Sequence, residues 1–375
     1  MKSMYYSLGL SCVVIASLLA FSSCEINNKP IIIGYSGCMT GRLSDLGTAG
    51  RNGVLLAVNE INEKGGIKGR HLKLIIKDDQ HDTETAKKVD LELIEEGAEV
   101  IIGHMTSTIS YDVQDIINNK KIVMVSPTAS TRMLSGKDDY FFRIMPELST
   151  STDYWADYLI RILKITSVSC IYDLSNETYT KNWYDNFASS YVRSGGEIIK
   201  TVTFSSGGNI SYLDLSKSLL TDETGGIMII ASAIDTAMIS QQVRKLGSSI
   251  PLYACGWAYT SDLIRYGGPS VENIIITHSY NKESKEPAFI EFSEKYFNAY
   301  GSKPDFASSY SYEAMLLIAH VLEKKTAVEK PGPEDFKNIV LKGLQSDIIT
   351  DEFGDAKRQP FLFTIKKGHF VLLNY

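Results

Sequence analysis

The chain has 375 residues, of which 44% are hydrophobic and 22% charged, and its formal net charge is −6. This length is enough for two domains with separate cores. The mild acidity argues against a nucleic-acid partner, and the six histidines show no metal-ligand spacing.

The first 23 residues have the pattern of a secretory signal. Lys2 precedes an apolar run over residues 8–21, and small residues then lead to Cys24. The run is too short to span a bilayer comfortably, and no later segment approaches that length. The end of the run resembles a bacterial lipobox with Cys24 as the acylated residue, although Phe21 stands where leucine is usual. The alternative is an ordinary signal peptide cut nearby, with Cys24 incidental.

We therefore expect an exported chain, anchored to the cell membrane through lipid on Cys24 and facing the periplasm or the cell exterior. Residues 24–29 form a short tether, and the folded part begins near Pro30.

Beyond the tether, short β-rich runs alternate with amphipathic helical stretches. The strand-like runs cover residues 31–33, 72–76, 100–102, 122–125, 140–144, 167–172, 198–204, 227–231 and 274–277. Helical patterns cover residues 54–61, 83–96, 179–194 and 236–246, and a hairpin closes the chain at 361–365 and 369–373. This alternation predicts an α/β protein with parallel sheets built from βαβ units, in two doubly wound, Rossmann-like lobes.

In such lobes ligands lie beyond the carboxyl ends of the strands. Two neighbouring post-strand loops, residues 103–108 and 126–131, are rich in hydroxyl groups, among them Ser107, Thr128 and Ser130. Hydroxyls and free backbone N–H groups at a helix start suit an anion such as a carboxylate. The alternative is that these residues are ordinary helix N-caps.

Four further residues lie in other post-strand loops. Tyr179 either lays its ring over a ligand or is a half-buried helix residue, and Trp257 is placed to wall the cleft. Asp235 either balances a ligand ammonium or caps the helix that follows it. Arg42 either pairs with an acidic ligand group or is a solvated surface residue.

Enzyme motifs are incomplete. Ser36 begins a nucleophile-elbow pattern, but Cys38 occupies the place of the last glycine, and no histidine is linked to Ser36 in sequence. The glycine-rich residues 47–53 have neither dinucleotide-binding nor P-loop spacing. His81, among acidic residues, is typical of a solvated turn. We expect no enzyme activity, no cofactor and no metal.

Three cysteines remain beyond Cys24, namely Cys38, Cys170 and Cys255. Their odd number and irregular spacing exclude a disulfide framework. Whether Cys38 and Cys255 meet is left open by the sequence.

Four stretches together resemble a known family: residues 59–69, 77–79, 101–104 and 125–130. The chain is similar to type I periplasmic binding proteins of the leucine/isoleucine/valine group, the substrate-binding parts of ABC transporters. The resemblance implies two lobes joined by a hinge of three crossing strands, which close on the ligand. Lobe one would then comprise residues 30–145 plus 280–347, and lobe two residues 146–279 plus 348–375.

In amino-acid binders of that family, the groups matching Ser107, Thr128 and Ser130 hold the α-carboxylate and help to hold the α-ammonium. The position matching Tyr179 closes over the ligand. The acidic partner of the ammonium is absent, because Trp257 occupies its place. Either Asp235 takes over that role, or the ligand is not an ordinary α-amino acid.

Two further departures from the family concern the first lobe. Leu46 stands where some aliphatic amino-acid binders carry an aromatic residue. A cystine of some members is replaced by His81 and Thr106.

The expected function is that of a solute-binding lipoprotein, which captures an amino acid or related small carboxylate and delivers it to a membrane permease. A ligand sensor without transport is the main rival, and a serine hydrolase using Ser36 is a second. The ligand itself is left open by the sequence.

Overall fold

The computed structural model describes residues 29–326 and 329–373. The expected signal peptide, the acylation site Cys24 and the tether up to Asn28 lie outside the described residues, and so they remain predictions.

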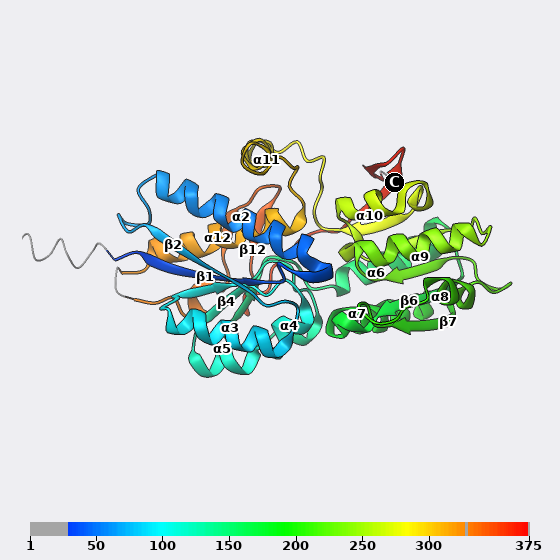
Figure 1. Cartoon of the computed structure of the whole chain (residues 1–375), viewed down its shortest axis with the longest axis horizontal. Helices are drawn as coiled ribbons and strands as arrows, with labels where there is room; N and C mark the ends of the chain where they lie inside the picture. Colours follow the sequence, from blue (N-terminus) through cyan, green and yellow to red (C-terminus); the bar gives the residue numbers. More distant parts are fainter. Residues whose placement is uncertain (1–28, 327–328, 374–375) are drawn as a thin grey trace, which may run out of the picture.

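The first lobe is built on a five-stranded parallel sheet in the order β2-β1-β3-β4-β5 (Figure 1). Its strands are β1 (Ile31–Gly37), β2 (Leu72–Asp78), β3 (Val100–Ile102), β4 (Val123–Ser126) and β5 (Phe141–Arg143). Helices α2 (Ser44–Glu63) and α12 (Phe306–Lys324) lie on one face, and α3 (Thr83–Glu95), α4 (Ser107–Asp112) and α5 (Gln114–Lys120) lie on the other. The sheet is therefore covered on both faces, as a parallel sheet requires.

The short central strands show why this sheet is buried on both faces. In β3, Val100 and Ile102 belong to the core that contains α2 and α12, while Ile101 belongs to the second core on the opposite face. In β4, Val125 and Met124 divide in the same way. A continuous apolar run thus supplies both cores, because successive side chains of a strand point to opposite faces.

The second lobe is built on a seven-stranded sheet in the order β14-β13-β10-β9-β8-β6-β7. Its strands are β6 (Ser167–Asp173), β7 (Glu197–Phe204), β8 (Ile227–Ile230), β9 (Leu252–Ala254), β10 (Ile275–His278), β13 (Phe361–Lys366) and β14 (His369–Leu372). Strands β6 to β10 are parallel, whereas the β13–β14 hairpin is antiparallel. The hairpin matches the one predicted from the sequence.

The remaining helices are α6 (Ser149–Asp157), α7 (Glu177–Arg193), α8 (Tyr212–Leu219), α9 (Ala233–Lys245), α10 (Ser261–Gly267) and α11 (Pro287–Tyr300). A small antiparallel ribbon pairs β11 (Val340–Lys342) with β12 (Asp347–Ile349). None of the helices in the described part of the chain is long and apolar enough to cross a membrane.

The chain passes between the lobes three times: after β5, after β10 and after β12 (Figure 1). Both sheets share one doubly wound order, in which the first strand lies between the second and third. The predicted α/β fold with two parallel-sheet lobes is confirmed. The exact lobe boundaries and the hinge motion remain predictions.

Candidate functional site

Loops at the carboxyl ends of strands from both lobes meet around one cavity of about 30 Å³. Five of the seven predicted site residues line it: Ser107, Thr128, Ser130, Tyr179 and Trp257. The rest of the wall consists of Leu46, Met105, Thr106, Met145, Asn176 and Phe306. The position agrees with the rule that doubly wound sheets bind ligands outside the carboxyl ends of their strands.

The hydroxyl groups on the first-lobe wall have complementary hydrogen-bonding capacity. Ser107 Oγ accepts the backbone N–H groups of Ser130 and Thr131, at 3.2 and 3.4 Å. Thr128 Oγ1 donates to the carbonyl oxygen of Met105 at 2.5 Å. A hydroxyl has one donor proton and two acceptor lone pairs. Ser107 therefore has only its proton left to offer, whereas Thr128 has only lone pairs.

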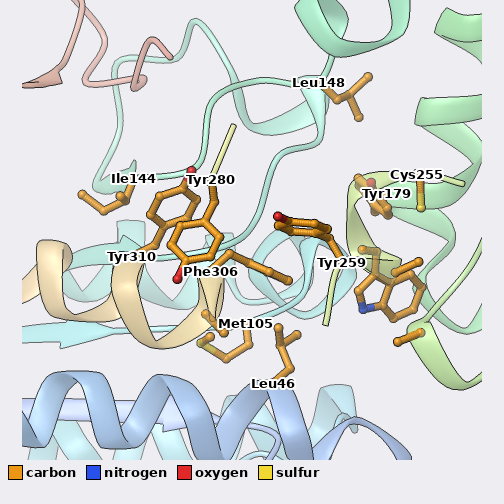
Figure 2. Packing of buried hydrophobic residues seen from close by; sticks show 14 of the residues in the cluster. Leu46, Met105, Ile144, Leu148, Tyr179, Cys255, Tyr259, Tyr280, Phe306 and Tyr310 are labelled. Atoms are coloured by element: carbon orange, nitrogen blue, oxygen red, sulfur yellow. The ribbon is translucent and has the colours of Figure 1, made fainter. Parts of the chain in front are cut away.

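The second-lobe wall is aromatic. Tyr179, near the start of α7, and Trp257, just after β9, meet edge to face with ring centroids 6.1 Å apart. Both side chains are buried, and burial raises the pKa of the Tyr179 phenol, so this group stays neutral. Figure 2 shows Tyr179 in one packed group with Leu46, Met105 and Phe306 from the first lobe.

Arg42 and Asp235, the other two predicted site residues, lie away from this cavity wall. Arg42 Nη2 lies 2.6 Å from Asp235 Oδ1, so the two residues pair with each other across the lobes. Asp235 also accepts the hydroxyls of Tyr212 and Ser232. The carboxylate oxygens of Asp235 thus already accept hydrogen bonds, and its charge is balanced by Arg42. Neither residue lines the cavity. The capping role belongs to Ser232, whose Oγ accepts from the Asp235 N–H.

Other contacts between the lobes were not anticipated from the sequence. Asn176 Oδ1 accepts from the Thr108 N–H at 3.1 Å, and Thr108 Oγ1 accepts from the Thr178 N–H at 3.2 Å. His81 was expected in a solvated turn, but its Nε2 lies 3.0 Å from the Ser175 carbonyl oxygen. These contacts show that the lobes are closed on one another.

His81 and Thr106 replace a family cystine, according to the resemblance, and the structure brings their side chains together. His81 Nδ1 and Thr106 Oγ1 lie 3.3 Å apart. A hydrogen bond thus joins the two positions where some relatives are expected to have a disulfide bond.

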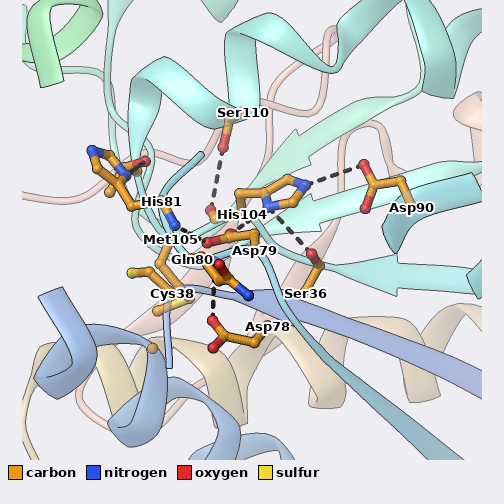
Figure 3. Close-up of polar contacts among 12 residues, drawn as sticks. Ser36, Cys38, Asp78, Asp79, Gln80, His81, Asp90, His104, Met105 and Ser110 are labelled. Carbon is orange, nitrogen blue, oxygen red and sulfur yellow. Dashed lines mark hydrogen bonds and ion pairs between the residues drawn. The ribbon is translucent and has the colours of Figure 1, made fainter. Parts of the chain in front are cut away.

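Ser36 has a histidine beside it after all, but the arrangement cannot act as a catalytic triad. His104 Nδ1 lies 3.3 Å from Ser36 Oγ and 2.7 Å from Asp79, and Nε2 lies 3.1 Å from Asp90 (Figure 3). Burial alone would lower the pKa of His104, but the charge of Asp90 and the hydrogen bonds to both aspartates raise it to about 10. The imidazolium therefore has no lone pair to accept a proton from Ser36, and all four side chains are buried.

Within residues 29–326 and 329–373, no cluster of histidine, cysteine and acidic side chains could hold a metal ion. Cys38, Cys170 and Cys255 are buried and unpaired, so Cys38 and Cys255 form no disulfide. Burial raises the pKa of the Cys170 thiol, as expected for an inert core residue.

Comparison with known proteins agrees with this geometry. The family model described as periplasmic binding protein matches residues 30–352. The Leu/Ile/Val-binding protein homolog 2 of Brucella abortus is 22% identical, with 92% of this chain and 93% of the relative covered.

Two solved structures share the fold. One is the branched-chain amino acid transporter substrate-binding protein of Streptococcus pneumoniae in complex with isoleucine, with a TM-score of 0.84, 22% identity and coverage of 91% of this chain and 98% of that one. The other is an ABC transporter solute-binding protein of Rhodopseudomonas palustris in complex with 3,4-dihydroxybenzoic acid, with a TM-score of 0.83, 18% identity and coverage of 92% and 96%. The chain thus belongs to the periplasmic binding proteins, in the type I group of Leu/Ile/Val-binding relatives, and is a binding protein rather than an enzyme.

Proposed function

We propose that this protein is the extracytoplasmic solute-binding component of an ABC transporter, and that it captures an amino acid or related small carboxylate between its lobes. The observation that carries the proposal is the pairing of Ser107 and Thr128 on the cavity wall. The free hydroxyl proton of Ser107 suits a carboxylate oxygen, and the free lone pairs of Thr128 suit an ammonium or another donor.

The binding of the ligand's head group is expected to come mainly from contacts to its carboxylate. None of the described residues that line the cavity is acidic, because Trp257 stands at the family's acidic position and Asp235 is paired with Arg42. An α-ammonium would therefore rest on hydroxyl and carbonyl oxygens alone. Relatives of similar fold were solved with isoleucine and with 3,4-dihydroxybenzoic acid, so both amino acids and aromatic acids are ligands to test.

Capture requires the lobes to separate. A cavity of about 30 Å³ holds only about two water molecules, which is far less than an amino acid occupies. In our proposal the ligand first binds Ser107, Thr128 and Ser130 on the open first lobe, and Tyr179 and Trp257 then close over it. The ligand stabilises the closed form because the second-lobe contacts exist only in that form.

The remainder of the proposal concerns location and partner. Acylation at Cys24 would hold the protein at the membrane, with the residues up to 29 as tether. The closed form would then be the state that the membrane permease recognises.

The experiment that tests the binding role is a thermal-shift and calorimetry screen of the purified protein, stripped of bound solute, against amino acids and small aromatic carboxylates. A ligand at 100 times its Kd should add about 2.7 kcal/mol of stability. The variant Ser107→Ala should weaken binding of the hit by about 1.5–3 kcal/mol, because a hydrogen bond to a charged group is lost.

Ser189→Ala is the matched control, since Ser189 is exposed on α7, away from the cavity. It should leave the affinity unchanged. Equal affinities of the wild type and the Ser107→Ala variant would exclude Ser107 from the carboxylate site.

A further inference from the structure

A second cavity of about 30 Å³ adjoins the first on the side where the chain crosses between the lobes. The two cavities share Ser130, Met145 and Tyr179 as a common wall. Beyond that wall, the second cavity is lined by residues of the second lobe, among them Glu147, His278 and Arg358. The cavity at Ser107 and the cavity at His278 are thus neighbours, separated by these three residues.

His278, the last residue of β10, carries a hydrogen-bond donor that the fold leaves unused. The side chain is 3% exposed, and its Nδ1 accepts the backbone N–H of Tyr280 at 2.9 Å. In the neutral ring the proton must then sit on Nε2, which has no hydrogen-bond partner among the described residues. Burial, with the nearby charges of Lys282 and Arg358, lowers the pKa of His278 to about 3, so the ring is neutral.

Aromatic side chains pack against this ring. The ring centroids of Phe306 and Tyr259 lie 4.6 and 5.4 Å from that of His278. Tyr259 and Phe306 belong to the aromatic group drawn in Figure 2. At the edge stands Gly256, where an added Cβ would lie 3.0 Å from His278 Cδ2. Gly256 and His278 both line the cavity, and the lack of a side chain at Gly256 leaves room beside Cδ2, the ring carbon bonded to Nε2.

The charges around the cavity restrict what this donor can recognise. Arg358 lies 2.5 Å from Glu313, and both side chains are buried, so its positive charge is already balanced. Glu147 adds a carboxylate to the same wall, and one of its oxygens accepts the N–H and hydroxyl of Ser149. A second carboxylate on the ligand would meet this negative charge without a free cation among the described lining residues. A neutral oxygen would not be repelled.

We propose that this cavity is a distal subsite in which the Nε2–H of His278 donates to a neutral acceptor at the far end of the ligand, such as an amide or hydroxyl oxygen. The subsite makes the protein selective for polar ligands over aliphatic ones of the same shape. This inference rests on the proposed carboxylate site at Ser107.

Calorimetry with two near-isosteric pairs of probes tests the subsite: asparagine against leucine, and glutamine against norleucine. In at least one pair, the wild type should bind the amide more tightly than the aliphatic partner. His278→Asn keeps an acceptor for the Tyr280 N–H but removes the cavity donor. It should weaken amide binding about tenfold and change the aliphatic partner less than twofold. His278→Gln places an amide N–H near the position of Nε2 and should restore most of the loss.

The outcomes separate the two proposals. If leucine or norleucine binds in a Ser107-dependent way but neither amide is preferred, or if His278→Asn weakens both members of a pair equally, the subsite is overturned and the carboxylate site stands. If all four probes bind the wild type and the Ser107→Ala variant alike, the carboxylate site fails and the subsite with it. If none of the four binds, the subsite is overturned, and the carboxylate site is decided by the screen of small aromatic carboxylates. The wild-type comparison remains decisive even if a His278 variant does not fold.

Discussion

At the scale of single residues, what a side chain can do depends on which of its hydrogen bonds the fold has already used. Ser107 and Thr128 carry the same functional group, yet backbone contacts leave one as a donor and the other as an acceptor. Asp235, which carries a full charge, has none to spare, because Arg42, Tyr212 and Ser232 occupy its oxygens. The two buried histidines differ in the same way. His278 has an unused N–H donor, whereas both ring nitrogens of His104 are already hydrogen-bonded.

The His104 cluster allows a prediction about stability and pH. His104 lies between Asp79 and Asp90 with no exposed surface. Its pKa of about 10 in the folded state is above the reference value of about 6.5. The stabilisation is therefore complete below about pH 6.5 and is lost as the pH rises through about 10. His104→Gln leaves two buried carboxylates unpaired and should lower the unfolding free energy at pH 7 by about 3–5 kcal/mol.

Urea denaturation at pH 7 and pH 10 measures this effect. The wild type should lose more stability between the two pH values than the variant does. His71→Gln, at an exposed histidine, is the control and should match the wild type at both. Equal pH dependence in wild type and His104→Gln would show that His104 is not the titrating group.

At the scale of elements, the glycine-rich motif of residues 47–53 turns out to be a packing face. Gly47, Gly50 and Gly53 are spaced by three along α2, which places them on one side of the helix. A Cβ at Gly53 would lie 2.0 Å from the Ser308 carbonyl oxygen of α12, and one at Gly47 would lie 2.1 Å from that of Cys38. The motif therefore serves the close approach of α2 to its neighbours, and no phosphate loop is needed to explain it.

The turn at Gly41–Leu43 contacts α9 across the two lobes through one ion pair. Arg42 reaches from the first lobe to Asp235 near the start of α9 in the second, so the pair exists only when the lobes are closed. Because the Arg42 side chain is 41% exposed, solvent screening limits its contribution to about 1 kcal/mol or less. Arg42→Ala should therefore raise the Kd of any captured ligand by about two- to fivefold, mainly through faster release.

Stopped-flow release and calorimetry provide the measurement. Arg265→Ala is the control, since Arg265 is exposed and its ion-pair partner Asp262 lies in the same helix. Small-angle scattering of the ligand-free protein should also show a more open average shape for Arg42→Ala. Unchanged release and unchanged scattering would contradict a role of this pair in closure.

At the scale of the whole molecule, three crossings of the chain join two sheets whose carboxyl edges meet. Such an arrangement suits domain closure, because only a few chain segments connect the two lobes and can act as a hinge.

The proposed acylation of Cys24 gives the prediction for the full chain. Cys24→Ser should abolish labelling by palmitate and move the protein from the membrane fraction to the soluble exported fraction. Ser23→Ala keeps a small residue before the cysteine and should leave labelling intact. Persistent labelling of the Cys24→Ser variant would place the lipid elsewhere, and an unlabelled wild type would support an ordinary signal peptide.

The sequence by itself determined the alternation of strands and helices, the α/β class and the family, because hydrophobic periodicity and loop motifs are local properties of the chain. It also singled out Ser107, Thr128, Ser130, Tyr179 and Trp257, since residues that follow parallel strands must gather at one edge of a sheet. Helix α12 is buried on most sides, so its sequence shows no clear polar face.

Only the tertiary structure decided the contacts between distant residues. Arg42 and Asp235, which form an ion pair, are 193 residues apart in the sequence. Ser36 and His104, which are hydrogen-bonded, are 68 residues apart. The closeness of His278 to Gly256, a residue of another loop, is likewise a tertiary contact. Such contacts have no signal in local sequence, because the partners of a side chain are set by how strands and helices pack in space.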